Sequence, residues 1–442
     1  MAHSSRYYRL ALALVAALTC ASAAEAQRAF GPFGGVLGAM SDADASHTLD
    51  LRGSLGGSWN DTLTSGDTSG IDPRFLRSDA GAGVSGALSH ARHASRFDWQ
   101  SGVASSLRLS GANTDPAAAS FNGQTSISTT ISRRVSLSGS GGYAYSPYYD
   151  FSPGLDGRLS SVGAYGGGFG VATAAQRNAS MSAGVGASTQ LSRRDTLSAS
   201  GSVSRYKFFG DADDPLGQVD GSTDQRSVGL RFNHTLTRSL GFHAGYGRSD
   251  ATYRLAGGAP VASDSIDVGV DYGDTLRFSR RTAFSFGSST SAVRWSNETH
   301  YRINGSAALT HGFGRSASAA LSYSRSTDFN AGFREPLLSD TVSAGFNSQL
   351  GRRASWSAQV GYLRSEIGFA STASHYNAFS AGGGVNAAVT RRIGVFADYS
   401  FYRNEIPVGS TVFAVLPKFS RQSVSAGLTL WVPLISEKRS TK

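Results

Sequence analysis

Strict alternation of apolar and polar residues over residues 178–208 constrains this chain more than any other feature. The alternation runs on both sides of a polar turn, Ser192-Arg193-Arg194. Met181 to Leu191 supply the apolar positions of the first arm, and Leu197 to Val203 supply those of the second. A period of two places each set on one side of a pleated strand, so the segment predicts a long β-hairpin. Soluble strands usually run about five or six residues, whereas arms of about a dozen residues match strands that cross a bilayer at a tilt.

The same unit, two alternating arms joined by a tight turn that contains arginine, recurs along the chain. The turns are Ser132-Arg133-Arg134, Ser192-Arg193-Arg194, Thr237-Arg238-Ser239, Ser279-Arg280-Arg281, Gly314-Arg315-Ser316, Gly351-Arg352-Arg353 and Thr390-Arg391-Arg392. A further turn at residues 91–95 brings the turn-linked hairpins to eight, and candidate first and last strands cover residues 47–60 and 419–432. The pattern therefore predicts about eighteen strands, and about sixteen to twenty are compatible with it. An even number is typical of a single-chain bacterial barrel.

The amino-terminal residues have the three parts of a secretory signal peptide. Arg6 and Arg9 precede an apolar stretch at residues 10–19, and Ala24-Glu25-Ala26 forms a small-x-small cleavage site. We therefore predict a signal peptide at residues 1–26, a short leader at 27–46, a barrel at 47–434 and a charged tail at 435–442. The leader is too short for the globular plug of an energy-coupled transporter, so an unplugged lumen is expected.

Composition and charge argue against several classes of protein. The longest apolar run, residues 10–18, is far shorter than the roughly 20 residues of a membrane-spanning helix. The net charge of +10 comes mainly from arginines placed singly or in pairs at turns and strand ends, which argues against nucleic-acid binding. The single cysteine, Cys20, lies in the signal peptide, so no thiolate metal site and no cofactor is expected. No Gly-x-Ser-x-Gly elbow or His-Glu-x-x-His helix is visible, and we predict no enzymatic activity.

A signal peptide, alternating arms, short turns at one end and longer loops at the other together resemble a Gram-negative outer-membrane β-barrel, porin-like in size, over residues 47–432. The closing stretch LTLWVPL at residues 428–434 resembles the aromatic carboxyl-terminal strand of such proteins. The resemblance implies an all-β fold, a transmembrane antiparallel up-and-down β-barrel with short periplasmic turns and longer extracellular loops. It also implies assembly by the barrel assembly machinery and a location in the cell outer membrane. A weaker resemblance is to outer-membrane barrels associated with exopolysaccharide export.

On the face assigned to lipid, several strands end in an aromatic residue that is followed two positions later by arginine. These pairs are Tyr246/Arg248, Tyr323/Arg325, Tyr362/Arg364 and Phe401/Arg403, with Val203/Arg205 as a variant. Aromatic residues are typical of the headgroup boundary. An outward arginine just beyond that boundary is a candidate to bind lipopolysaccharide phosphates with bidentate geometry, and generic interfacial snorkelling is the alternative.

The opposite face of the predicted strands carries mainly Ser, Gly, Thr, Asn and Gln. A barrel of about eighteen strands encloses more space than such side chains fill, so a water-filled lumen is expected. Charges of both signs are assigned to this lumen face: Arg108, Arg231, His243, Asp267, Asp271, Arg277, Arg294, Arg302 and Asp398. Because arginines outnumber acids, such a pore would favour anions. Ion pairs between neighbouring strands are an equally acceptable interpretation of these charges.

The longest predicted loop, Pro147–Gln176, is the third on the long-loop side. In porins, which the chain resembles, the third loop folds into the lumen and narrows it. Asp150, Asp156 and Arg158 are therefore the constriction-loop candidates; alternatively, the glycine-rich part at 160–173 extends the next strand beyond the membrane. The acidic loop 210–224 offers carboxylates for Ca²⁺ but lacks EF-hand spacing, which favours a solvated polar loop.

These observations favour a porin-like channel for passive diffusion of small hydrophilic solutes. The alternative is a non-enzymatic accessory barrel for envelope assembly or exopolysaccharide export, in which protein partners matter more than the pore. The expected partners are outer-membrane lipid, lipopolysaccharide and the barrel assembly machinery, and no nucleic acid. A homo-oligomer and polysaccharide-export partners are both compatible with the sequence.

Overall fold

The computed structural model of the chain describes residues 45–64, 79–110, 117–147, 177–210, 221–237, 239–254, 261–275, 281–295, 298–314, 316–328, 333, 335–351, 353–368, 374–407 and 418–438. The elements in these ranges are β1 (Ala45–Thr64), β2 (Asp79–His93), β3 (Phe97–Ser110), β4 (Ala117–Ser132), β5 (Val135–Ser146), β6 (Arg177–Gln190), β7 (Asp195–Phe209), β8 (Gly221–Thr235), β9 (Leu240–Tyr253), β10 (Val261–Thr275), β11 (Thr282–Trp295), β12 (Glu298–Phe313), β13 (Ala317–Asp328), β14 (Leu337–Leu350), β15 (Ala354–Ile367), β16 (Ser374–Ala388), β17 (Ile393–Glu405) and β18 (Lys418–Lys438). Within these ranges, no helix is long and apolar enough to cross a membrane.

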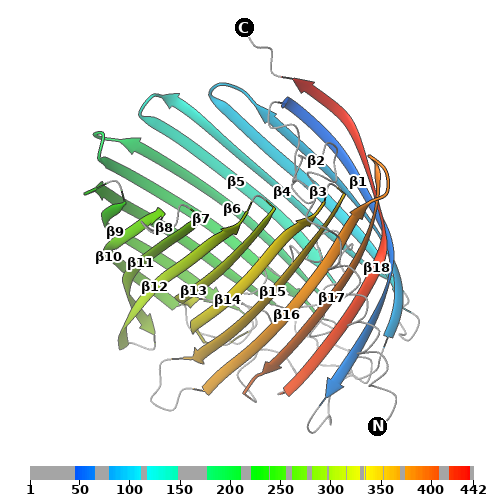
Figure 1. Ribbon diagram of the computed structural model, residues 1–442. Helices are drawn as coiled ribbons and strands as arrows, with labels where there is room; N and C mark the ends of the chain where they lie inside the picture. The colour runs from blue at the N-terminus through cyan, green and yellow to red at the C-terminus, as the bar shows by residue number, and fades with distance from the viewer. Residues whose placement is uncertain are drawn as a thin grey trace.

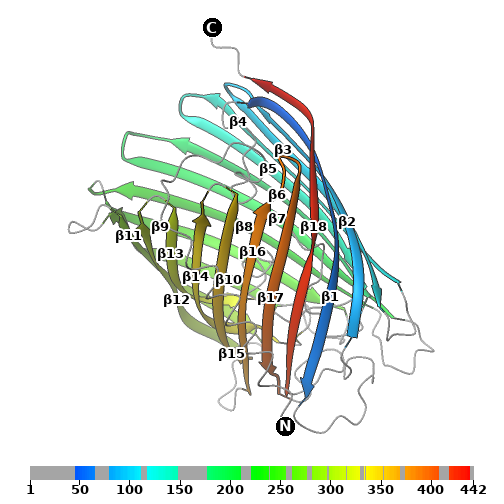
Figure 2. The same cartoon turned by 45° about the vertical axis from the view of Figure 1, so that its right-hand side comes forward.

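Each strand pairs antiparallel with its neighbour in sequence, and β18 pairs back onto β1, so the 18-stranded sheet is a closed ring. The strands run obliquely around the wall, and β1, in blue, lies between β18, in red, and β2 (Figures 1 and 2). The seam between the first and last strands extends from Ala45 opposite Lys438 to Thr64 opposite Phe419. Closure matters in lipid because an unpaired backbone group there has no water to bond. The predicted up-and-down barrel is confirmed.

Within the described residues, the tight turns that begin with serine or threonine share a hydrogen-bonding pattern that explains this residue. Ser192 Oγ accepts hydrogen bonds from the backbone N–H groups of Arg194 and Asp195 at 3.0 and 3.1 Å. Thr390 Oγ1 makes the two equivalent contacts at 3.1 and 3.0 Å. In this arrangement the hydroxyl replaces a backbone acceptor, which favours Ser or Thr at the first position of the turn. The arginines that follow are exposed at both turns, as expected for a hairpin end outside the membrane.

The two faces of the wall differ in polarity. On β1 the exposed Leu51, Leu55 and Trp59 alternate with the buried Ser54 and Ser58. The exposed set points away from the barrel interior, and the buried set points into it. On the other strands, too, the exposed apolar side chains occupy every second position and so share the outer face. Such an apolar outer face requires lipid as its solvent.

The hairpin predicted at residues 178–208 is formed by β6 and β7. Its outer residues are among the most exposed apolar side chains of the barrel, with Met181 at 56%, Val185 at 70% and Val203 at 51%. The serines between them belong to the opposite, inner face. The period-two prediction is therefore confirmed for both arms.

Aromatic side chains mark both rims of the outer face. Near the turn end, the ring of Phe346 lies 6.1 Å from that of Phe313 and 4.8 Å from that of Trp356. Near the loop end, Tyr246 and Tyr323 are exposed on the same outer face. Two aromatic rows that flank an apolar band are the signature of a transmembrane barrel.

The inner face becomes apolar toward the loop end, which the sequence pattern did not predict. Phe333, between β13 and β14, packs on Tyr376 with ring centroids 5.4 Å apart. The Tyr376 hydroxyl lies 3.1 Å from the Tyr402 hydroxyl, and all three side chains are buried. Further buried apolar residues follow around the inner wall, namely Phe208, Val261, Val293, Leu337, Leu363 and Ile367. The interior therefore has a polar turn-side half and a partly apolar loop-side half.

The ends of the barrel lie slightly beyond the predicted bounds. β1 begins at Ala45, before residue 47, and β18 continues to Lys438, so it includes part of the predicted tail at 435–442. The pairing of β1 with β18 has register shifts between Ala45 and His47 and between Leu49 and Asp50. The two strands nevertheless stay paired as far as Ala45 and Lys438. The predicted signal peptide and most of the leader lie outside the described residues.

Candidate functional site: the barrel interior

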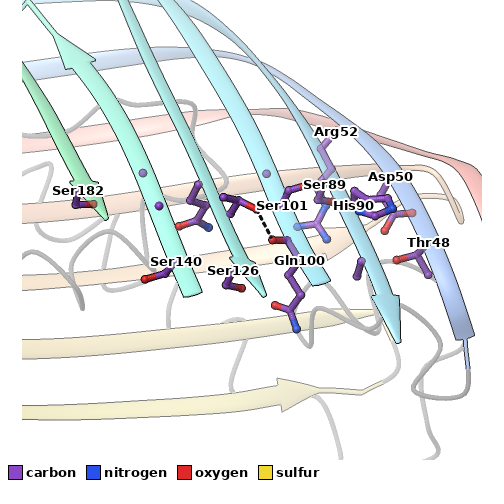
Figure 3. Close-up of a pocket in the computed structure, with 16 residues that line it drawn as sticks. Thr48, Asp50, Arg52, Ser89, His90, Gln100, Ser101, Ser126, Ser140 and Ser182 are labelled. Atoms are coloured by element: carbon purple, nitrogen blue, oxygen red, sulfur yellow. Dashed lines mark hydrogen bonds between the residues drawn. The ribbon is translucent and has the colours of Figure 1, made fainter. Parts of the chain in front are cut away.

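A polar cavity of about 580 Å³ lies against the inner wall of β1 to β6. Its lining is rich in hydroxyl and amide groups, including Gln100, Ser126, Ser140 and Ser182 (Figure 3). These positions lie on neighbouring strands that pair with one another. On each strand, small polar residues repeat at period two and so occupy the inner face. Such groups hydrogen-bond water and uncharged polar molecules without a fixed charge preference.

One acid–base pair adds charge to this cavity. Asp50 and Arg52 lie two residues apart on the inner face of β1, next to Ser89 of β2 (Figure 3). The remaining lining groups are mostly neutral, so both signs are present but sparse. The cavity has the size and polarity to hold a small hydrophilic solute or several waters.

A second inner cluster, on β8, β9 and β10, concentrates charge. Arg231 donates through Nη1 to Asp267 Oδ2 at 2.9 Å and through Nη2 to Asp271 Oδ2 at 2.8 Å. Its Nε donates to Asn233 Oδ1 at 2.9 Å. His243 lies between the same two carboxylates, with Nε2 2.9 Å from Asp267 Oδ1 and Nδ1 2.7 Å from Asp271 Oδ2. The two carboxylates are thus each held by two cationic or donor groups.

An irregularity in the β10–β11 pairing positions this cluster. Regular pairing stops after Ile266 and resumes at Tyr272. His243 faces Gly269 across the β9–β10 pair, and its Nε2 reaches Ser288 O of β11 at 3.0 Å. A Cβ on residue 269 would lie only 2.8 Å from His243 Nε2, so glycine leaves the space that the imidazole occupies. A bulge of this kind re-aims side chains and is common beside functional sites.

The predicted lumen charges divide into three groups. Arg108, Arg302 and Asp398 lie on the inner face together with the Arg231 cluster, because each alternates with exposed apolar residues of its own strand. Arg277 lies outside the described residues. The prediction for Arg294 is wrong. Arg294 alternates in phase with Phe286, which faces outward on β11, and its cross-strand partner Thr299 lies on the outer face of β12.

The reason for the error at Arg294 is the inner apolar lining. Val293 is fully buried and faces the interior at the loop end of β11. From the sequence alone, an apolar residue such as Val293 is assigned to the lipid-facing side. The next residue, Arg294, is then wrongly assigned to the lumen. The centre of β11, which includes Ser288 and Ser289, is rich in serine. It has no apolar residue that would show which side of the strand faces lipid.

The outward arginines have carboxylate partners that sequence reasoning missed. Arg205 forms a bidentate pair with Asp224 of β8, with Nη2 3.1 Å from Oδ2. Arg325 Nε lies 3.8 Å from Asp340 Oδ1, and the Tyr323 hydroxyl donates to the same oxygen at 2.6 Å. Each acid lies on the strand that follows, at the facing register position.

The other members of the outer row are arranged similarly. The Tyr246 hydroxyl donates to Asp264 Oδ1 at 2.7 Å, and Arg248 pairs with Asp250 at 3.3 Å. Arg403 Nη2 donates to Glu405 Oε1 at 2.9 Å. Arg364 faces Asp340 on β14 and Asn377 on β16 in register. All five predicted arginines lie on the outer face at the loop end.

The constriction-loop candidates Asp150, Asp156 and Arg158 lie outside the described residues, as does most of the acidic loop at 210–224. Their predicted roles stay predictions.

A closed ring of 18 antiparallel strands, with an apolar outer band, aromatic rims and a polar interior, defines a transmembrane β-barrel of the outer-membrane class. No protein-family model and no curated protein matches the sequence. Solved structures with a similar fold include OpdO of Pseudomonas aeruginosa, at 12% identity over 89% of this chain and 99% of that one, with a TM-score of 0.42. OpdQ of the same organism has 9% identity over 89% and 98%, with a TM-score of 0.43. OccAB4 of Acinetobacter baumannii has 10% identity over 88% and 100%, with a TM-score of 0.42. The assignment of the fold rests on the strand pairing itself.

Proposed function

We propose that the barrel is a porin-like channel through which small hydrophilic solutes diffuse passively across the outer membrane. The observation that carries the proposal is the polar cavity on the inner wall of β1 to β6, within a ring of 18 strands. Hydroxyl and amide groups there replace water contacts of a passing solute without binding it tightly. The mixed, mutually paired charges of the Arg231 cluster fit the ion-pair interpretation better than a strong anion filter.

Purified, folded barrel is expected to give discrete conductance steps when it is added to a planar lipid bilayer. Folding is verified independently by heat-modifiable migration on gels, which reports the closed barrel. A heat-denatured sample of the same preparation is the control and is expected to give none. Folded barrel that inserts into the bilayer but never conducts would contradict the channel.

We also propose that the barrel is not an enzyme, because neither the His243 cluster nor the His234–Asp195 contact forms a hydroxyl–imidazole–carboxylate relay. Both ring nitrogens of His243 face acceptors, two carboxylates and a backbone oxygen. At the turn end, Asp195 lies between His234 and Ser192 and bonds both. This order is the reverse of a nucleophile–base–acid relay, in which the imidazole must lie between the hydroxyl and the carboxylate.

The outer arginines support a further proposal, that the loop-end rim contacts lipopolysaccharide. Carboxylate partners hold four of the five guanidinium groups in place, those of Arg205, Arg248, Arg325 and Arg403. Arg205 still has Nη1 available beyond its bidentate pair. Phosphate groups of lipopolysaccharide are suited to such fixed donors. The pairs also reduce the net charge of the rim, so each contact is expected to be modest.

Replacing Arg205, Arg325 and Arg403 together by glutamine is expected to lower the affinity for purified lipopolysaccharide about tenfold. The estimate takes about 0.5 kcal/mol for each exposed contact. Titration of labelled barrel in detergent measures it. The control replaces Arg193 and Arg194 in a turn at the opposite end, and no change is expected there. Loss of affinity in the control alone would show that lipopolysaccharide binds at the turn end. The turn end, and not the loop end, would then face the outside of the cell.

A further inference from the structure

The inner face of β17, β18 and β1 carries a group of buried polar side chains, three of which have polar atoms without a hydrogen-bond partner among the described residues. We call this group the polar strip, and it comprises Asp398, Ser423, Ser425, Ser58 and Asn60. No member is more than 9% exposed. Among the described residues, no partner is found for Asp398 Oδ2, Ser58 Oγ, or either amide atom of Asn60. A buried polar atom without a partner is costly, so these atoms point to a bound molecule that supplies the bonds.

Strand register brings the strip together. Ser425 faces Asp398 of β17 on one side and Ser58 of β1 on the other. Ser423 faces Asn60 one step further toward the loop end. Facing residues have Cβ atoms about 4.5–5.5 Å apart, so neighbouring members lie within the span of one small molecule. The strip is therefore continuous across three strands.

The surroundings give the strip apolar ends and an open side. Phe396 covers the backbone of β18 and β1 at the turn-side end, where both strands have glycine. Tyr402 lies at the other end, fixed by the hydroxyl of Tyr376 at 3.1 Å. On β16, Gly384 faces Asp398, and the next inner position is Gly382. Because glycine has no side chain, the wall is recessed beside the carboxylate.

The unmade bonds distinguish between classes of ligand. A cation would satisfy the carboxylate and the amide oxygen but leave the NH₂ group of Asn60 without acceptors. An anion would accept from that amide but would lie close to the carboxylate of Asp398. A hydroxyl group both donates and accepts, so a molecule with several hydroxyls meets both needs.

We propose that the polar strip binds a neutral, polyhydroxylated solute of the sugar type, with Phe396 at the turn-side end of the site and Tyr402 at the loop-side end. This deepens the proposed channel function, on which it rests, by naming the class of solute. Asn60 donates to and accepts from hydroxyls of the solute, and Asp398 and Ser58 accept from them. Exclusion of bulk water from the strip strengthens each of these bonds.

The test uses the full-length folded barrel and maltotriose as the probe. Maltotriose is expected to interrupt the current of single channels in a concentration-dependent manner and to raise the unfolding temperature of the barrel in detergent. Asn60→Asp keeps the shape but removes the donor and adds a carboxylate near Asp398, so the affinity is expected to fall about tenfold or more. Asn122→Ala, which removes an exposed inner amide on β4, is the matched control and is expected to bind as the original chain does.

The outcomes separate the strip from the channel. Conductance steps without any maltotriose effect would overturn the strip and leave the channel intact. Stabilisation by maltotriose that Asn60→Asp removes, without conductance, would support the strip and contradict the channel. Stabilisation by K⁺ or Ca²⁺ that Asp398→Asn removes, with no response to maltotriose, would replace the sugar with a cation. No response to any probe would mean that the strip holds ordered water only, which also overturns the proposal.

Discussion

Replacing Gly427 by valine is expected to prevent closure of the barrel. A Cβ at residue 427 would lie 2.7 Å from the Gly56 Cα and 2.8 Å from the Phe396 ring, and closer still to the backbone oxygen of Leu55. The backbone atoms cannot move away without breaking the β1–β18 pairing, so the seam is expected to separate. Heat-modifiable migration on gels measures closure directly, and the folded band is expected to disappear.

The matched control for this substitution is Gly102→Val. Residue 102 is also a glycine on the inner face, but its Cβ would meet nothing nearer than Leu88 O at 3.8 Å. The added side chain then enters the polar cavity, where there is room, and the folded band is expected to persist. Equal folding of the two variants would show that close packing at the seam does not control closure.

Replacing His243 by alanine is expected to destabilise the barrel by about 2–3 kcal/mol. The side chain is 2% exposed and contacts Asp267, Asp271 and the backbone oxygen of Ser288. Its removal leaves that oxygen unpaired at the point where the β10–β11 ladder is already interrupted, and leaves Arg231 alone with two acids. The urea midpoint for unfolding from lipid vesicles measures the loss.

His234→Ala tests whether burial, not the histidine–aspartate contact itself, causes that loss. His234 contacts Asp195 at 2.6 Å, but both side chains are about one third exposed, at 35% and 27%. Exposed ion pairs contribute about 1 kcal/mol or less, so a small shift in midpoint is expected. A larger loss at His234 than at His243 would contradict the role given to the inner cluster.

The wall of the barrel was predictable because lipid imposes a simple rule on each strand. Every second residue must be apolar, and backbone groups must pair, so period-two arms and tight turns determine the strand number. Met181 and Val185 illustrate this, since their sequence positions alone placed them correctly on the outer face. The serine or threonine that begins a turn is similarly local, because its hydroxyl bonds the next few N–H groups.

The contacts between strands were not predictable in the same way. Which acid meets Arg205 depends on the register of β7 against β8, and register does not appear in the alternation of either strand. Asp224 lies among several acids of that region, and only pairing selects it. The polar strip has the same origin, because Asp398 and Asn60 are separated by most of the chain and become neighbours only through β18.

The closing seam also determines when the barrel can be completed. Hairpins such as β6–β7 join residues that are close in sequence, so they form early and independently. β1 meets its second partner only when residues 418–438 arrive, because those residues form β18. Until then one strand edge is open and ready to pair with any other chain. The first strand must therefore be shielded throughout export, and the shielding must end when the last strand is delivered.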